Sequence, residues 1–170
     1  MNFSKLFNNQ STTNQVIRNI VIIGIFFSAG SVLANYYGVH FNLSNSFKEK
    51  VFIVKKQFDP NKINRFDLIS TYPPIENNYV PKGEKIIKQV VCVPGQSFVT
   101  RGADYYCDGH RVAIAQNKDS KGKEIARFNF TGVVPKDNFF IVGDNPKSYD
   151  SRYFGFVERK NITGVALWRF

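Results

Sequence analysis

The sequence predicts a mainly β protein, with one N-terminal transmembrane helix followed by an antiparallel β-sheet or barrel-like domain. The N-terminal region contains a long apolar stretch without charge. Many short apolar segments, separated by turn residues at short spacing, follow it and are typical of antiparallel strands. The chain has 170 residues, of which 43% are hydrophobic and 15% aromatic, which is enough for one packed domain with an appendage.

The apolar stretch predicts a membrane anchor. Residues 20–34 carry no charge, and the apolar run of about 21 residues after Arg18 is long enough to span a hydrocarbon core of about 30 Å. We expect a flexible cytoplasmic tail at 1–15, a transmembrane signal anchor at 16–37, and one folded domain at 38–170. Arg18 before the helix favours a cytoplasmic N-terminus and a domain outside the cytoplasm. The segment 32–34 resembles a cleavage site, so a removable signal peptide is the alternative.

The remainder of the chain reads as short strands. Pro73, Pro94 and the turn at 108–109 interrupt apolar runs, because Pro cannot continue a central strand and Asp-Gly favours a hairpin turn. No internal repeat and no further domain boundary is evident within 38–170. We expect strands at residues 50–55, 66–72, 86–93, 98–100, 104–107, 111–115, 138–143 and 164–170.

Charge and cysteine usage exclude several function classes. The formal net charge is +10, but the basic residues are scattered and no nucleic-acid motif is present, so we expect no nucleic-acid partner. The two His and two Cys show no metal-site spacing, and we expect neither metal nor cofactor. Cys92 and Cys107 would form a disulfide in an oxidising compartment, and would otherwise be two buried thiols.

The polar segment 143–155 is the richest in chemistry. Ser148, Asp150 and Arg152 alternate, so on an extended chain they would point to one side. Such a side could orient a neighbouring catalytic group through a charge-assisted hydrogen bond. The alternative interpretation is a polar surface turn with an ion pair.

Lys88 is the candidate general base. On a strand it shares a face with the apolar Ile86, Val90 and Cys92. Burial disfavours the charged ammonium and lowers the pKa of a lysine, and a neutral amine can accept a proton. The alternative is a lysine at a strand edge whose amine reaches water.

Ser44 and Ser46 are the candidate nucleophile and oxyanion donor. They lie two residues apart just after the apolar stretch, so both hydroxyls could face one point of an extended chain. One hydroxyl could attack a carbonyl while the other stabilises the developing oxyanion. The alternative is a Ser/Asn-rich linker next to the membrane.

In this order, the three segments resemble the type I signal peptidase superfamily of Ser/Lys proteases, and most closely its TraF branch of conjugative-transfer pilin peptidases. Residues 143–155 are similar to that family's most specific motif, and 88–95 to its lysine box, Lys-x-Val-x-x-x-Pro-Gly. Residues 65–67 resemble a weaker third box, and 42–46 resemble the nucleophile segment of the TraF branch. The family has Pro and Gly at the positions of Lys48 and Lys50, so we expect a different loop after the nucleophile.

The resemblance implies a role for each matching residue. Ser46 would be the nucleophile and Lys88 the general base. The hydroxyl of Ser44 and the backbone N–H of Ser46 would form the oxyanion hole. Ser148 would orient the amine of Lys88, and Asp150 and Arg152 would form a supporting ion pair. The family's catalytic domain lies on the periplasmic side of the bacterial inner membrane, which is consistent with a Cys92–Cys107 disulfide.

The function that the resemblance implies is a membrane-anchored serine endopeptidase that matures a conjugative pro-pilin through an acyl-enzyme. The implied partners are the pro-pilin peptide, inner-membrane lipid and proteins of conjugative pilus or type IV secretion assembly. Water would release the product, or the substrate's own N-terminal amine would close it into a ring. The alternatives are a general type I signal peptidase and a non-catalytic pilus assembly factor with the same fold.

Overall fold

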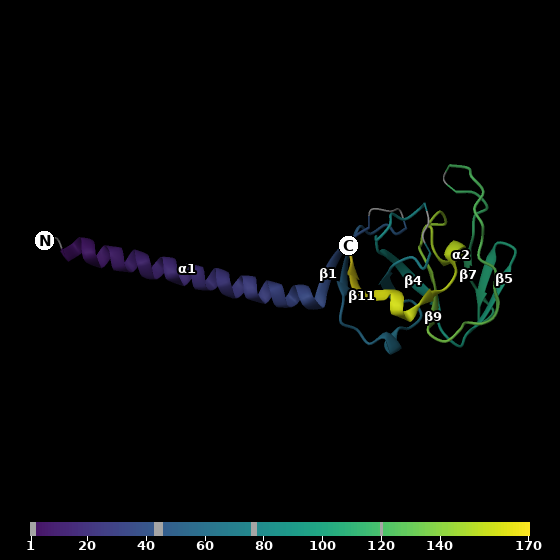
Figure 1. Cartoon of the computed structure of the whole chain (residues 1–170), viewed down its shortest axis with the longest axis horizontal. Helices are drawn as coiled ribbons and strands as arrows, with labels where there is room; N and C mark the ends of the chain where they lie inside the picture. The colour runs from purple at the N-terminus through teal and green to yellow at the C-terminus, as the bar shows by residue number, and fades with distance from the viewer. Residues whose placement is uncertain (1–2, 43–45, 76–77, 120) are drawn as a thin grey trace. The chain divides into compact units, whose positions relative to one another are not determined.

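The computed structural model of the protein describes residues 3–42, 46–75, 78–119 and 121–170 (Figure 1). The chain divides into two units, Met1–Tyr37 and Gly38–Phe170. The first unit is helix α1, Phe3–Tyr36. Within it, Thr12–Tyr36 is long and apolar enough to cross a membrane, with a mean hydropathy of 2.0. The helix begins at Phe3 rather than at residue 16, because no Pro or Gly precedes Gly24 to interrupt it.

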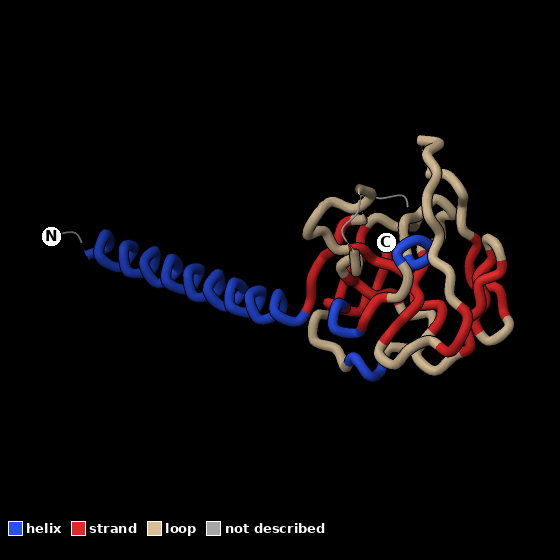
Figure 2. The backbone as a smooth tube through the Cα atoms, turned by 45° about the vertical axis from the view of Figure 1, so that its right-hand side comes forward, coloured by secondary structure: helices blue, strands red, loops and turns tan. Residues whose placement is uncertain are grey.

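The second unit is built from two antiparallel sheets, whose strands Figure 2 shows in red. The prediction of a mainly antiparallel β protein with one N-terminal apolar helix is confirmed. The larger sheet has seven strands, in the spatial order β1 (Tyr37–Phe41), β2 (Val51–Lys55), β11 (Ile162–Arg169), β3 (Leu68–Thr71), β4 (Ile86–Cys92), β9 (Asn138–Val142) and β10 (Val157–Glu158).

The smaller sheet has four strands, in the order β7 (His110–Ile114), β6 (Asp104–Cys107), β5 (Ser97–Arg101) and β8 (Thr131–Val133). A four-residue helix, α2 (Ser151–Phe154), and two 3-10 turns, Pro60–Lys62 and Arg159–Asn161, complete the unit. The predicted strands agree with β2, β3, β4, β5, β6, β7, β9 and β11 to within about two residues at each end. Strands β1, β8 and β10 were not predicted; the last two have only three and two residues.

Three apolar clusters form the core. The first packs around Ile69, Val90 and Ile141, at the centre of the larger sheet. The second lies around Phe98, whose ring centroid is 4.5 Å from that of Phe140. The third comprises Phe47, Phe52, Val54 and Ile87.

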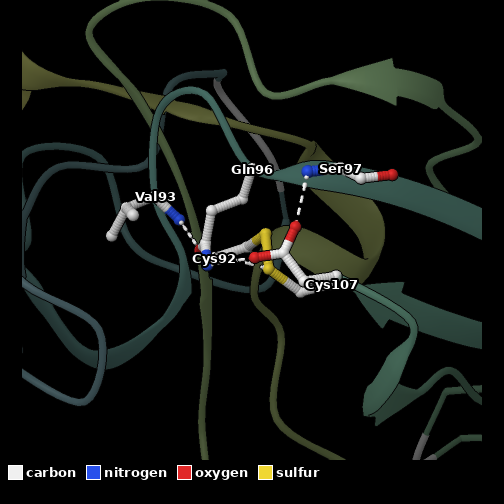
Figure 3. Close-up of a disulfide and its surroundings, with 6 residues drawn as sticks. Cys92, Val93, Gln96, Ser97 and Cys107 are labelled. Atoms are coloured by element: carbon white, nitrogen blue, oxygen red, sulfur yellow. Dashed lines mark hydrogen bonds between the residues drawn. A yellow bond between two sulfur atoms is a disulfide. The ribbon is translucent and has the colours of Figure 1, made fainter.

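A disulfide between Cys92 and Cys107 lies inside the second cluster (Figure 3). It connects β4 of the larger sheet to β6 of the smaller sheet. Beside it, the backbone N–H of Val93 donates to Gln96 Oε1 at 2.9 Å, which closes the turn between β4 and β5. The disulfide therefore fixes the end of the strand that carries Lys88 to the neighbouring sheet.

Candidate active site

Ser46 and Lys88 meet in the interior of the second unit. Lys88 lies in the middle of β4, opposite Ile69 of β3, and only 2% of it is exposed. Its Nζ lies 2.5 Å from the Oγ of Ser46, which is also buried. Phe47, the next residue, packs edge-on against Phe52 with a centroid distance of 5.8 Å. This apolar contact of the third cluster, which includes Ile87 of β4, holds Ser46 and Phe47 over that strand.

Burial lowers the pKa of Lys88 to about 8. The negative charge of Asp150 opposes this change, and the positive charge of Arg152 adds to it. A substantial fraction of the amine is therefore neutral at mildly alkaline pH. In that state its lone pair can accept the proton of the Ser46 hydroxyl, which lies within hydrogen-bond reach.

Ser148 contacts the alcohol of this pair. Its hydroxyl donates to Ser46 Oγ at 3.0 Å, and both side chains are buried. The sequence predicted that Ser148 orients the amine of Lys88, and this role stays a prediction. The backbone N–H of Asn145 donates to the carbonyl of Ser46 at 3.1 Å, so the 143–148 loop holds Ser46 through both backbone and side chain.

Gly143 permits this close packing. A Cβ at this position would lie 2.6 Å from Ser148 Oγ and 3.1 Å from the Ser46 carbonyl oxygen. The first contact is shorter than van der Waals packing allows and the second is tight, so a side chain here would displace the Ser148 hydroxyl or the Ser46 backbone. Sequence reasoning noted Gly143 only as a boundary of the polar segment, because a close approach between distant segments leaves no local signal.

Asp150 and Arg152 form a buried ion pair, with Arg152 Nη2 2.6 Å and Nε 2.8 Å from the Asp150 carboxylate. The carboxylate also accepts from the backbone N–H of Gly143 at 2.9 Å. Arg152 donates in addition to the carbonyls of Asn145, Pro146, Ser148 and Ile114. Burial lowers the pKa of Arg152, but hydrogen bonds and the charge of Asp150 outweigh it and raise the pKa overall.

The expectation that Ser148, Asp150 and Arg152 alternate on an extended chain is wrong. Asp150 is the N-cap of helix α2, where its side chain accepts from the Arg152 N–H, and Arg152 lies in the first turn. The three residues are brought together by this cap and by the Arg152 donor to the Ser148 carbonyl. The segment is therefore a polar turn with an ion pair, but the three side chains are buried and do not lie at the surface.

Ser44 lies outside the described residues, so the predicted oxyanion hole of Ser44 and the Ser46 N–H stays a prediction. The described residues contain no group of three His, Cys, Asp or Glu side chains that could hold a metal ion.

A groove runs beside Lys88. A pocket of about 600 Å³ is lined by residues of β1 and by the start of β4, including His40, Phe41, Ile86 and Lys88. In β4, the ladder with β9 covers only Gln89–Cys92, so among the described strands none pairs with this edge of Ile86–Lys88.

His40 is a polar group of this groove that sequence reasoning did not place. Burial, followed by the charges of Lys85 and Lys88, lowers its pKa. The position of His40 in the groove follows from strand β1, in which Gly38 and His40 are less exposed than their neighbours. Because β1 was not predicted, sequence reasoning had no basis for placing His40 there.

Comparison with known proteins places this geometry in a family. The sequence profile of the signal peptidase, peptidase S26 family matches residues 12–170. The conjugal transfer protein TraF of Agrobacterium fabrum is 30% identical over 167 residues, which cover 89% of this chain and 93% of that protein. A probable signal peptidase I-1 of Synechocystis is 31% identical over 69% of this chain and 58% of that protein.

An inactive signal peptidase IA of Staphylococcus aureus is 27% identical over 72% of this chain and 68% of that protein. Family membership alone therefore does not establish activity, and catalysis has to be argued from the residues present. The match over nearly the whole chain, together with the resemblance to TraF, shows that this protein belongs to the signal peptidase S26 family and resembles its TraF-like branch.

Proposed function

We propose that the protein is a membrane-anchored serine endopeptidase in which Ser46 is the nucleophile and Lys88 the general base. The observation that carries this proposal is the 2.5 Å approach of the Lys88 amine to the Ser46 hydroxyl, in surroundings that lower the pKa of the amine to about 8. A purely structural lysine at this depth would require a carboxylate partner, and no acid contacts Lys88 among the described ion pairs and hydrogen bonds.

The reaction follows from this pair. Neutral Lys88 accepts the proton of Ser46 as Oγ attacks the peptide carbonyl carbon, and a tetrahedral oxyanion forms. The predicted oxyanion donors are the Ser44 hydroxyl and the Ser46 N–H. When the carbon–nitrogen bond breaks, protonated Lys88 gives its proton to the departing amine, and an ester of Ser46 remains. Attack by water or by another amine then releases the acyl group.

The free edge of Ile86–Lys88 is the proposed binding site for the substrate. An extended peptide can add as a strand there, because no described strand pairs with this edge and the same three residues line the groove. The strand would run directly past the Lys88 side chain, which brings a scissile carbonyl to Ser46. We expect small residues at the cut, as the family resemblance implies, and the apolar side chains of Ile86, Ile87 and Phe41 line the groove that would hold them.

The apolar helix and the disulfide support the proposed location. Thr12–Tyr36 can span a membrane, and a buried disulfide persists in oxidising compartments outside the cytoplasm. We therefore propose a cytoplasmic segment at 1–15, an inner-membrane anchor at 16–37 and a periplasmic protease domain at 38–170.

A conjugative pro-pilin is the proposed substrate, and proteins of the pilus or type IV secretion assembly are the proposed partners. Support comes from the similarity to the conjugal transfer protein TraF, which covers 93% of that protein. The acyl-enzyme then has two fates: hydrolysis to a linear pilin, or attack by the pilin's own N-terminal amine to form a ring.

The test is the mass of the pilin in cells that carry the wild type, Ser46→Ala or Lys88→Ala protein. We expect both variants to accumulate unprocessed pro-pilin, and a product lighter by one water than the linear form would identify cyclisation. Normal processing by either variant would exclude the Ser/Lys pair. It would favour a non-catalytic assembly factor, an alternative that is supported by the existence of an inactive relative. Processing of many unrelated exported proteins would instead favour a general signal peptidase.

A further inference from the structure

A second pocket is lined by Gln89, the residue that follows Lys88 on β4. It has a volume of about 510 Å³ and lies between the end of the larger sheet and β7 of the smaller sheet. Gln89 and Val91 of β4 contribute to one wall, and residues 111–114 of β7 to the other.

The pocket is connected to the nucleophile by a shared wall. Asp144 and Pro146 line it, and they also line a pocket of about 590 Å³ that contains Ser46, Lys48 and Lys50. A peptide that continues past Ser46 would therefore enter the smaller-sheet side of the domain across Asp144 and Pro146. Arg152 fixes this wall, because it donates to the carbonyls of both Pro146 and Ile114.

The lining carries three arginines, Arg65, Arg111 and Arg152, and one acid, Asp144, among residues that are otherwise uncharged. Arg152 is matched by Asp150 at 2.6 Å, and Arg111 contacts Asp104 at 3.4 Å on the exposed side. The adjoining pocket adds Lys48 and Lys50, the two residues at which the chain differs from the family pattern.

Among the arginines that line the pocket, Arg65 has a buried N–H donor without an acceptor among the described residues. Its Nε is buried and makes no hydrogen bond to any described residue, and its guanidinium lies over the Phe66 ring at 4.9 Å. A buried donor without an acceptor is rare in folded proteins and indicates a missing partner. A carboxylate is the acceptor that suits the planar guanidinium, since it can take two parallel hydrogen bonds.

The backbone beneath Arg65 is held in a strained conformation. Phe66 has a φ of 77°, which is uncommon for a bulky residue. The Phe66 N–H donates to the Val90 carbonyl at 2.7 Å, and Val90 N–H donates to the Asp67 carbonyl at 2.8 Å. Strain of this kind persists where surrounding structure fixes it, and it is concentrated at ligand-binding sites. Strand β4, which carries Lys88, thus also fixes the position of Arg65.

We propose that this arginine pocket binds an acidic side chain of the substrate, located after the scissile bond, and so selects substrates with an acidic segment on the leaving side. The inference rests on the proposed peptidase function and adds a specificity determinant to it. Arg65 provides the buried donor, Arg111 the second cation, and the two lysines beside Ser46 attract the same segment.

The test uses the full-length enzyme and peptides that share small residues before the cut. Asp or Asn is placed at each successive position on both sides of the cut, and kcat/KM is measured for each pair. We expect the Asp peptide to be favoured about tenfold, which corresponds to about 1.4 kcal/mol, at one or two adjacent positions after the cut. Arg65→Gln should remove this preference, and Arg111→Gln should reduce it.

Arg101→Gln is the matched control, because Arg101 also lies over an aromatic ring, that of Tyr106, but does not line the pocket. It should leave the preference unchanged. A preference spread evenly over all positions would reflect only the net positive charge, and a preference before the cut would place acids in the Lys88 groove. Either result would overturn the proposal, as would a preference that survives Arg65→Gln.

Binding to the Ser46→Ala protein separates this inference from the proposed function. Fluorescence anisotropy of the labelled Asp and Asn peptides reports the pocket without catalysis. If the wild type cleaves no peptide but Ser46→Ala binds the Asp peptide more tightly in an Arg65-dependent manner, the proposed chemistry fails and the acidic-segment site stands. Equal binding of the Asp and Asn peptides would refute the site. The site would also be refuted if neither peptide displaced the other while vesicles of anionic lipid bound the protein through Arg65.

Discussion

The pKa of Lys88 sets a pH dependence that can be worked out from the structure. Burial moves it from 10.5 to about 8, so the neutral amine, which is the proposed acceptor of the Ser46 proton, becomes the main form only above about pH 8. We expect log(kcat/KM) to rise with a slope of one below pH 8 and to reach a plateau above it. At pH 6 the rate constant should be roughly a hundredfold below the plateau, because only about one amine in a hundred is then neutral.

The assay is cleavage of a peptide whose own groups do not titrate between pH 6 and 10. His40, whose pKa is lowered from 6.5, lines the same groove. His40→Gln should therefore leave the rise near pH 8 unchanged and serves as the matched control. A rate that still rises at pH 10 without a plateau would show the ordinary pKa of a hydrated amine. A flat profile would show that no group with a pKa near 8 controls the rate. Either result would refute the argument from burial.

The same pKa difference makes a prediction for stability. Between about pH 8 and 10.5 the unfolded chain carries a proton on Lys88 that the folded chain lacks, so the stability contribution of this group rises with pH across that window. Below pH 8 the buried amine costs about 3 kcal/mol, the free energy that corresponds to the difference between 10.5 and about 8. Lys88→Met should thus abolish activity yet raise the urea midpoint at pH 7. A clear decrease of that midpoint would contradict a desolvated amine.

Three further predictions concern the residues around the pair. Gly143→Ala should lower kcat at least about tenfold with an intact fold, since its Cβ would lie 2.6 Å from Ser148 Oγ. Gly24→Ala, with open space around its Cβ, is the control. An unchanged kcat for Gly143→Ala would show that the position of the Ser148 hydroxyl is not critical. Asp150→Asn should cost about 3–5 kcal/mol in urea unfolding, because it leaves the buried Arg152 without a counter-charge; a loss below about 1 kcal/mol would argue against this pairing. Replacing both Cys92 and Cys107 with Ser should cost about 3 kcal/mol, the value for a loop of 15 residues, and a thermal midpoint unaffected by reductant would contradict the bond.

Local sequence patterns were sufficient to locate most of the sheet and the chemistry-bearing segments. Val51–Lys55 and Ile86–Cys92 follow simple apolar patterns, and the structure has strands there. The burial of Lys88 could be anticipated because apolar residues precede and follow it along the same strand, Ile86–Cys92. Strands β8 and β10 could not be predicted, since Thr131–Val133 is exposed at all three positions and Val157–Glu158 has only two residues, so neither has a periodic apolar pattern.

The contacts that assemble the site were beyond local reasoning, because they join residues far apart in the chain. The Ser148 hydroxyl meets Ser46 across 102 positions, and Lys88 meets Ser46 across 42. The alternation of Ser148, Asp150 and Arg152 suggested a strand, but Asp150 can satisfy the Arg152 N–H only as a helix cap. Ser148, Asp150 and Arg152 therefore meet in a capped turn and not on the extended chain that their spacing suggested.

The buried Asp150–Arg152 pair is better explained by positioning than by stability. Burying an ion pair often gains nothing over apolar packing, and apolar residues at these positions would avoid its desolvation cost. They could not, however, replace the donors of Arg152 to the carbonyls of Asn145, Pro146, Ser148 and Ile114. Those carbonyls belong to the loop that carries Ser148 and to the wall shared by the nucleophile and arginine pockets. Arg152→Lys keeps the charge but loses most of these bonds. It should therefore lower kcat and weaken the preference for an acidic substrate residue in the same variant, whereas an ion pair needed only for folding would leave both unchanged in the molecules that fold.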